Sequence, residues 1–391
     1  MFIERDLTQE IKNGLQHYPI VVITGARQTG KTTLVKKIIE KEYLNLESPE
    51  IRELAKNDPN LFLKNISKKG AIIDEFQRVP ELASYLQVVV DEKKQNGQFI
   101  LTGSNNFLLM KNISQSLAGR VALLKLLPLT IKELTNQNIT NDLNNLLYNG
   151  FYPAIYSENR NPTQVYNFYY QTYIERDLRQ LINIKDINNF QTFMKLCAGR
   201  IGQELNIKSL SNDIGISFNT IKEWLSVLSA SYIIFLLPPY FENINKRVIK
   251  SPKLYFYDVG LASYLLGNEN PRHIETHPLR GNLFENLVIL EYLKYRYNKG
   301  LENNAFFYRD NHQNEVDLVV KSGNNYLLIE IKSASTYNNG FKKNLDWLEK
   351  NINGNVIKKI IIYSGQKEWK DDQFEIINYL NFIKSLKQND F

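Results

Sequence analysis

The stretch that decides the fold is "PIVVITGARQTGKTTLVKKI", residues 19–38. It opens with an apolar run typical of a buried strand and continues through a loop that contains Gly25 and Gly30. It ends in a segment whose Leu34, Val35 and Ile38 have the spacing of one helix face. A strand, a glycine-containing loop and a helix in this order indicate the first unit of a parallel α/β sheet.

The loop of this stretch, "GARQTGKT", matches G-x-x-x-x-G-K-[ST] and lies in the required context, between a strand and a helix. The backbone N–H groups of such a loop and of the helix N-terminus bind phosphate. Lys31 would add positive charge at the phosphates of ATP, and the Thr32 hydroxyl would ligate Mg²⁺. The predicted nucleotide-binding residues here are Gly25, Ala26, Arg27, Gln28, Thr29, Gly30, Lys31, Thr32 and Thr33.

A second motif, "AIIDEF" at residues 71–76, has two acids at the end of an apolar strand. Asp74 is placed to hold Mg²⁺ together with the bound nucleotide. Glu75 is placed to polarise an attacking water, and this adjacent acid favours hydrolysis over a switch that does not hydrolyse.

Two further positions are ambiguous from the residues alone. The strand "QFILTGSNN" ends in Thr102, Ser104 and Asn105. Of these we prefer Ser104 or Asn105 as the polar residue between Glu75 and the γ-phosphate, the alternative being that they simply cap the strand. Arg120, in "LAGRV", is either an arginine finger for transition-state charge or a member of a structural ion pair.

The bulk properties are those of an ordinary globular protein. The 391 residues predict two or three domains, and we place their bounds at 1–148, 149–250 and 251–391. One cysteine, Cys197, excludes an internal disulfide or a multi-cysteine zinc site. The charged N-terminus and short apolar runs predict a cytoplasmic protein that does not span a membrane. A net charge of +7 is compatible with a nucleic-acid partner but is weak evidence for one.

From residue 149 onward the pattern changes from alternating strands and helices to helices alone. Residues 207–240 have a helix, a turn at Gly215 and a second helix, followed by two apolar strand-like pieces. This order is typical of a winged helix-turn-helix. The second helix would present Asn219, Thr220 and Lys222 to DNA, but its few basic residues favour a role in protein packing instead.

Several of these motifs together resemble a known family. The run "VVITGARQTGKTTL", "IIDEFQRVPEL", "ILTGSNN", "LAGR" and "LPLTIKEL" is similar to the prokaryotic AAA-type P-loop ATPases that end in a C-terminal domain called DUF4143. "NGFYPAIY", "YIERDLRQ", "KSPKLYFYDVGL" and "GNLFENLVILEYL" extend the resemblance over nearly the whole chain. It implies ATP binding and hydrolysis, and a homo-oligomer in which an arginine such as Arg120 reaches a neighbour's nucleotide.

The C-terminal hairpin "NEVDLVVKSGNNYLLIEIK", residues 314–332, contains charges where a sheet normally has none. Glu330 and Lys332 are two residues apart and share one face, and hairpin pairing brings Asp317 beside them. Glu285, on the preceding helix, is a further candidate. Converging carboxylates bind Mg²⁺, and a nearby lysine can orient a hydrolytic water.

This hairpin resembles the PD-(D/E)xK nuclease core, although Val316 stands where the motif has proline. The resemblance implies that Asp317, Glu330 and Glu285 bind metal and that Lys332 is catalytic. The alternatives are a satisfied ion-pair cluster and a nuclease fold that binds without cutting. The expected architecture is therefore α/β: a parallel-sheet P-loop NTPase (AAA-type) domain, a helical and winged-helix middle, and a PD-(D/E)xK-like α/β domain. The predicted partner is nucleic acid. The alternative is a protein partner, whose binding by this chain is gated by ATP.

Overall fold

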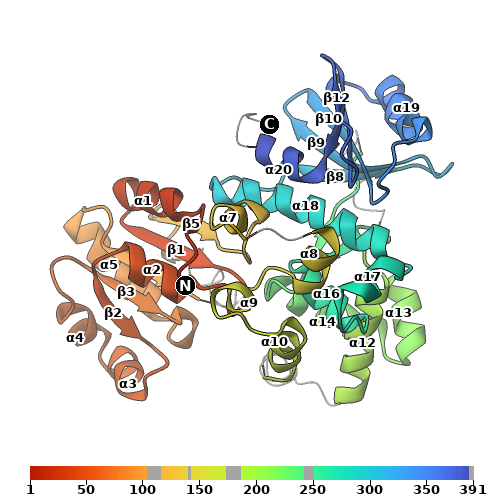
Figure 1. Cartoon of the computed structure of the whole chain (residues 1–391). Helices are drawn as coiled ribbons and strands as arrows, with labels where there is room; N and C mark the ends of the chain where they lie inside the picture. Colours follow the sequence, from red (N-terminus) through yellow and green to blue (C-terminus); the bar gives the residue numbers. More distant parts are fainter. Residues whose placement is uncertain (104–115, 140–141, 173–185, 242–250, 387–391) are drawn as a thin grey trace. The chain divides into compact units, whose positions relative to one another are not determined.

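The computed structural model describes residues 1–103, 116–139, 142–172, 186–241 and 251–386 (Figure 1). The chain forms two compact units, each described here by itself. Unit 1 consists of Met1–Leu129, Ala230–Ile233 and Arg296–Leu301. Unit 2 consists of Thr130–Ser229, Ile234–Tyr295 and Glu302–Phe391. The predicted division into three domains stays a prediction.

Unit 1 is built on a sheet of five described strands, all parallel, in the order β2-β3-β4-β1-β5. The strands are β1 (Ile20–Thr24), β2 (Glu42–Asn45), β3 (Ala71–Asp74), β4 (Phe99–Thr102) and β5 (Val121–Lys125). The helices are α1 (Thr8–His17), α2 (Lys31–Ile38), α3 (Pro49–Asn57), α4 (Pro59–Lys64) and α5 (Leu82–Lys93) (Figure 1). The predicted parallel α/β sheet is confirmed.

Helices cover both faces of this sheet, which explains why its strands are apolar without alternation. Ile20 and Val22 of β1 belong to one core cluster, together with apolar residues of α3, α4 and α5. Val21 and Ile23 belong to a second cluster, with residues of α1 and α2. Because all five strands run in one direction, their carboxyl ends meet at one edge, where ligands bind in such sheets.

The first part of unit 2 is mainly helical. Its helices are α7 (Ile131–Thr135), α8 (Leu143–Asn149), α9 (Pro153–Ser157), α10 (Pro162–Tyr169), α12 (Ile187–Gly199), α13 (Ile207–Ile214), α14 (Phe218–Ala230), α16 (Val259–Leu265) and α17 (Pro271–Thr276). Gly215 ends α13 in the left-handed conformation, with φ of 76°, before α14 begins. The strands β6 (Ile234–Leu237) and β7 (Lys253–Phe256) follow and pair antiparallel. A helix-turn-helix followed by two strands is present, whereas its use as a winged helix stays a prediction.

The second part of unit 2 contains a six-stranded sheet in the order β12-β13-β11-β10-β9-β8. Its strands are β8 (Ala305–Arg309), β9 (Glu315–Ser322), β10 (Asn325–Lys332), β11 (Asn355–Tyr363), β12 (Trp369–Lys370) and β13 (Phe374–Asn378). The helices α18 (Arg280–Asn298), α19 (Lys343–Asn351) and α20 (Tyr379–Ser385) complete it. The predicted hairpin is β9–β10, antiparallel and turning at Gly323, which has φ of 60°. A C-terminal α/β region is thus confirmed.

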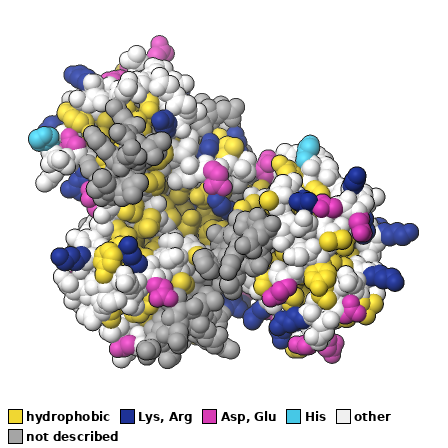
Figure 2. Space-filling model, turned by 180° about the vertical axis from the view of Figure 1, so that it is seen from behind, with side chains coloured by type: hydrophobic (Ala, Val, Ile, Leu, Met, Phe, Trp, Pro, Cys, Tyr) yellow, Lys and Arg dark blue, Asp and Glu magenta, His cyan; other side chains and the backbone are white. Residues whose placement is uncertain are grey.

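Membrane insertion finds no support in the described helices, since each is too short or too polar to reach across a bilayer. On the face drawn in Figure 2, acidic and basic side chains are interspersed. The net positive charge of the chain therefore does not appear on that face as a patch of one sign.

Candidate functional site

The loop between β1 and α2 has a backbone that requires glycine at its first position. Gly25 has φ of 146°, and a Cβ atom there would lie 2.0 Å from the carbonyl oxygen of Leu126. Gly30 has φ of 88° and leads directly into the first turn of α2 at Lys31. The loop therefore lies at the carboxyl end of β1 with the N-terminus of α2 behind it. This is the geometry in which backbone N–H groups bind phosphate.

Lys31 is buried at the base of this loop. Its Nζ donates to the carbonyl oxygens of Gly25 and Ala26, at 2.9 and 2.8 Å. Burial lowers the pKa of Lys31 to about 8, although the negative charges of Glu75 and Asp74 oppose the shift. A buried ammonium that donates to neutral carbonyl oxygens is stabilised further when an anion binds beside it.

Asp74 is the centre of a hydrogen-bond network at the same sheet edge. The hydroxyls of Thr32 and Tyr43 donate to its Oδ2 atom at 2.8 and 2.6 Å. The hydroxyl of Thr102 and the backbone N–H of Glu75, the latter at 3.1 Å, donate to its Oδ1 atom. Asp74 is thus oriented from β2, β4 and α2 together, and its carboxylate adjoins the Thr32 hydroxyl.

Glu75 follows Asp74 in a conformation that is unusual for a residue with a side chain. Its φ is 55°, in the left-handed region, and Gln77 donates from Nε2 to its Oε2 atom. Burial raises the pKa of the Glu75 carboxyl, while the positive charge of Lys31 lowers it. A strained, half-buried carboxyl with a raised pKa is typical of a general base, although structural networks also produce such shifts.

Three residues of this site were not predicted. Tyr43 and Thr102 orient Asp74, as described above, and Arg5 supports the loop. The buried Arg5 guanidinium donates from Nη1 to the carbonyl oxygen of Thr29 at 2.8 Å and from Nη2 to that of Leu127 at 2.6 Å. Arg5 lies in the charged N-terminal segment "IERD", where no spacing rule connects it to a loop more than twenty residues away.

The remaining predicted residues of unit 1 have varied positions. Thr29 is buried, and its hydroxyl donates to the carbonyl oxygen of Ala26 at 2.9 Å, whereas Thr33 is exposed. Arg27 contributes positive charge near Lys31, and Gln28 has φ of 64°. Ser104 and Asn105 lie outside the described residues.

Arg120 forms an ion pair with Asp91 on α5. Its Nε and Nη2 atoms donate to the two carboxylate oxygens at 2.6 and 2.7 Å. This is the structural alternative considered for Arg120. A role toward the nucleotide of a neighbouring subunit stays a prediction.

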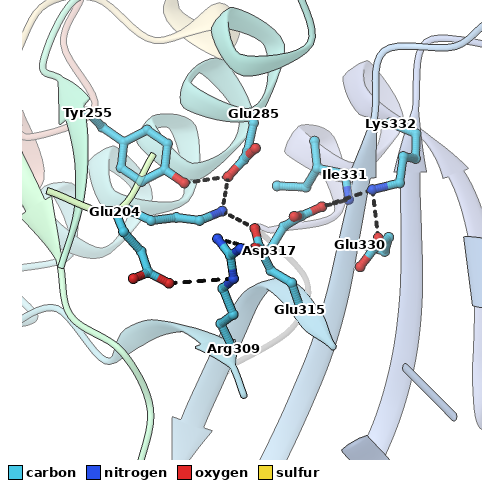
Figure 3. Close-up of polar contacts among 10 residues, drawn as sticks. Glu204, Tyr255, Glu285, Arg309, Glu315, Asp317, Glu330, Ile331 and Lys332 are labelled. Carbon is cyan, nitrogen blue, oxygen red and sulfur yellow. Dashed lines mark hydrogen bonds and ion pairs between the residues drawn. The ribbon is translucent and has the colours of Figure 1, made fainter. Parts of the chain in front are cut away.

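The C-terminal hairpin does bring Asp317, Glu330 and Lys332 together (Figure 3). The Lys332 ammonium lies 2.6 Å from Glu330 Oε1 and 3.4 Å from Asp317 Oδ2. Asp317 also accepts a hydrogen bond from the backbone N–H of Ile331 at 2.8 Å. Burial alone would lower the pKa of Lys332, but Asp317 and Glu330 outweigh it and raise that pKa. Lys332 is therefore held as an ammonium in this arrangement.

Glu285, the fourth predicted member, contacts a lysine that was not predicted. The Lys253 ammonium, at the start of β7, lies 2.9 Å from Glu285 Oε1 and 2.6 Å from Glu315 Oε1. The Tyr255 hydroxyl also donates to Glu285 (Figure 3). Arg309 approaches Glu315 Oε2 at 3.4 Å.

These residues form the acidic cluster, which we define as Glu285, Glu315, Asp317 and Glu330 with the cations Lys253, Arg309 and Lys332. Burial raises the pKa of both Glu285 and Glu330, and the neighbouring Asp317 charge adds to each shift. Throughout the described ranges, no three acids or histidines are grouped so that they could hold a metal ion. The assignment of Glu285, Asp317 and Glu330 as metal ligands stays a prediction.

On α14, the predicted recognition residues Asn219 and Lys222 are exposed and Thr220 is half-buried. The Lys222 ammonium lies 4.9 Å from the centre of the Phe218 ring, and Glu223 beside it is exposed. The helix therefore presents one cation and one anion among these residues. These residues offer few cations for reading DNA, and the role of the helix in packing or in DNA binding stays a prediction.

Comparison with known proteins gives matches along the whole chain. Residues 17–135 match a family described as an AAA domain, residues 140–272 match the domain of unknown function DUF8612, and residues 280–382 match DUF4143. An uncharacterized protein of Mycobacterium tuberculosis is 32% identical over 344 residues, which cover 86% of this chain and 75% of the relative. One from Methanocaldococcus jannaschii is 27% identical over 421 residues, covering 98% and 90%. Among solved structures, a Walker-type ATPase of Pyrococcus abyssi has a TM-score of 0.38 and 15% identity, covering 68% of this chain and 96% of that one.

Proposed function

Because the chain belongs to the family that joins an AAA domain to a C-terminal DUF4143 domain, we propose that it is a Mg²⁺-dependent ATPase. The observation that supports this proposal is the meeting of Lys31, Thr32, Asp74 and Glu75 at one edge of the unit 1 sheet. Lys31 and Thr32 come from the start of α2, and Asp74 and Glu75 from the end of β3. Each has the side chain that phosphoryl transfer to water requires.

The residues fit a nucleotide with its metal ion. The Thr32 hydroxyl and the Asp74 Oδ2 atom lie 2.8 Å apart and are both oxygen ligands of the kind that Mg²⁺ prefers. These two residues would hold the ion, which when bound neutralises charge on the phosphates. Tyr43 and Thr102 keep the Asp74 carboxylate in place for this role.

The chain's own residues supply the remaining chemistry. Lys31 exchanges its two carbonyl contacts for phosphate oxygens, which are better partners for an ammonium than neutral carbonyls. The loop N–H groups and the N-terminus of α2 hold the phosphates in position. Glu75, as a carboxylate, accepts a proton from the attacking water, and its raised pKa makes it a stronger base than an exposed glutamate.

The test is to measure ATP turnover and ATP binding separately for wild type, Lys31→Ala and Glu75→Gln. We expect Lys31→Ala to lose both binding and turnover, and Glu75→Gln to bind ATP but lose turnover by about 100-fold or more. Lys37→Ala is the matched control, because Lys37 is an exposed lysine on the same helix. Unchanged turnover in Lys31→Ala would refute the assignment.

A second candidate function is action of the C-terminal region on a partner, driven by the nucleotide cycle. The two alternatives are cleavage of nucleic acid and binding without cleavage. The adjacency of Asp317, Glu330 and Lys332 supports action on nucleic acid, but the residues as arranged do not fit a metal ion, because ammonium groups lie among the carboxylates. This arrangement supports the alternative in which ATP gates binding to a partner and the domain does not cut.

Cleavage of DNA and RNA with Mg²⁺ or Mn²⁺, by wild type, Asp317→Ala and Lys332→Ala, separates these two alternatives. Cutting by wild type that both substitutions abolish would establish a nuclease. Equal cutting by all three proteins would indicate a contaminant, and the absence of cutting on every substrate is the result that we expect.

A further inference from the structure

Lys253 enters the acidic cluster from outside the DUF4143 segment, and its backbone is held on two sides. On one side it pairs with Leu237 of β6. On the other it bridges to Glu204, with Leu254 N–H donating to Gln203 O at 3.1 Å and Leu205 N–H donating to Pro252 O at 2.8 Å. These backbone contacts fix the Cα position of Lys253, and its ion pairs and burial hold the side chain within the cluster. The lysine is therefore a fixed part of the structure.

The Lys253 ammonium occupies the space between two carboxylates. It lies 2.9 Å from Glu285 Oε1 and 2.6 Å from Glu315 Oε1, and its side chain is only 2% exposed. It also lies over the Phe307 ring, 5.4 Å from the ring centre. Figure 3 shows Glu285 and Glu315 directed toward this common point, with Asp317 beside them.

A divalent metal ion needs the same oxygens that Lys253 uses. Mg²⁺ and Mn²⁺ bind through direct metal–carboxylate bonds of about 2.0–2.2 Å, and they must approach carboxylates that are not already paired with a fixed cation. An ammonium within hydrogen-bond distance of both Glu285 and Glu315 blocks that approach by charge and by volume. Lys332 has the same relation to Asp317 and Glu330, at 3.4 and 2.6 Å.

We propose that Lys253 is a built-in counter-cation that takes the place of a metal ion between Glu285 and Glu315 and so excludes divalent metals from the acidic cluster. The cluster then connects β7 with α18 and β9 through ion pairs. This inference goes beyond the proposed ATPase and does not depend on it.

The test measures Mn²⁺ binding by electron paramagnetic resonance in the absence of nucleotide, on the full chain. Wild type and Asp317→Asn should bind Mn²⁺ equally weakly, because the cluster takes up no ion in either. Lys253→Met should bind Mn²⁺ on the order of tenfold more tightly than wild type, since three carboxylates lose a fixed positive charge. The double variant that combines Lys253→Met with Glu285→Gln should lose this gain in Mn²⁺ affinity.

A matched control separates metal binding from the general loss of a buried lysine. Lys294 is 1% exposed on α18 and lies 2.9 Å from Glu291, so Lys294→Met also breaks a buried ion pair but should give a smaller gain in Mn²⁺ binding. Circular dichroism establishes that each variant is folded. A folded Lys253→Met that gains no Mn²⁺ overturns the proposal. If Lys253→Met does not fold, the comparison of wild type with Asp317→Asn still decides: tighter binding by wild type would show that Lys253 does not exclude the metal.

Discussion

The Arg5 guanidinium offers a sharp test of how the nucleotide loop is supported. Arg5 donates to the carbonyl oxygens of Thr29, within the loop, and of Leu127, beyond β5. Arg5→Met keeps a long side chain of similar length but removes both hydrogen bonds. Thr29 and Leu127 are buried, so that water does not readily replace the lost donors.

The size of the effect follows from these two contacts. A buried acceptor left without its donor costs about 1–3 kcal/mol, so that the loss of two donors in Arg5→Met should destabilise the native state of unit 1 by about 2–6 kcal/mol. Relaxation of Thr29 relieves part of this cost by letting the loop leave its binding conformation. If the relaxed loop adopts that conformation only about one time in ten, the Kd for ATP rises about tenfold.

Two measurements examine this prediction. Urea unfolding gives the loss of stability, and ATP titration with turnover at saturating ATP gives Kd and kcat. We expect a higher Kd with kcat nearly unchanged, because both hydrogen bonds of Arg5 go to backbone carbonyls that position the loop. Arg5→Lys should fall between wild type and Arg5→Met, because one ammonium can still reach one carbonyl. Arg78→Met, at an exposed arginine of the same unit, is the control.

An unchanged Kd in a destabilised Arg5→Met would refute the reasoning about the loop, since the loss of stability would then arise elsewhere. A large fall in kcat at saturating ATP would also contradict it. That result would mean that Arg5 acts on the reaction and not only on the position of Thr29.

Of three other predictions, two concern the nucleotide site and one concerns unit 2. Lys31 has a pKa of about 8 in the native state and an ordinary value of 10.5, so that between these two pH values the unfolded chain binds one proton more than the native state. The free energy of unfolding should therefore rise with pH across that window. Urea unfolding at a series of pH values measures this rise, and Lys31→Met should abolish it. The Glu75 carboxyl must lose its proton to act, and its pKa is raised above 4.5, so ATP turnover should fall on the acid side at a higher pH than an exposed glutamate would give, as a pH–rate profile would reveal. Gly150→Ala should destabilise unit 2 by about 3 kcal/mol or more, because Gly150 has φ of 61° and the new Cβ would lie 2.0 Å from Tyr166 Oη and 2.4 Å from Asp258 Oδ1. Thermal unfolding measures the effect, and an unchanged midpoint would contradict this close packing around Gly150.

The residues of the nucleotide site that lie on local motifs were predictable. Lys31 and Thr32 follow a glycine loop whose spacing sets their place at the start of a helix. Asp74 and Glu75 end an apolar strand, and parallel strands bring their carboxyl ends to one edge. The order of the elements therefore predicted that these groups would meet, and the structure shows their separation, 2.8 Å from Thr32 Oγ1 to Asp74 Oδ2.

The residues that support the site were not predictable in this way. Tyr43 lies at the second residue of β2 and Thr102 at the last of β4, and no spacing in the sequence connects either residue to Asp74. Their contact with Asp74 depends on the strand order β2-β3-β4-β1-β5, which places β3 between β2 and β4. Strand order is a property of the folded sheet, and several orders are compatible with the same alternating pattern.

The sequence by itself determined the nucleotide loop and the pairing of Asp317, Glu330 and Lys332 in one hairpin, because each depends on residues close together in the chain. The alternation of apolar strands with helices predicted the parallel sheet of unit 1, but not its strand order. Only the tertiary structure decided what surrounds them. Arg5 reaches Thr29 and Leu127, and Lys253 reaches Glu285 and Glu315, across many residues of intervening chain. A buried charge is stable only with partners close in space, and folding alone determines which residues those are.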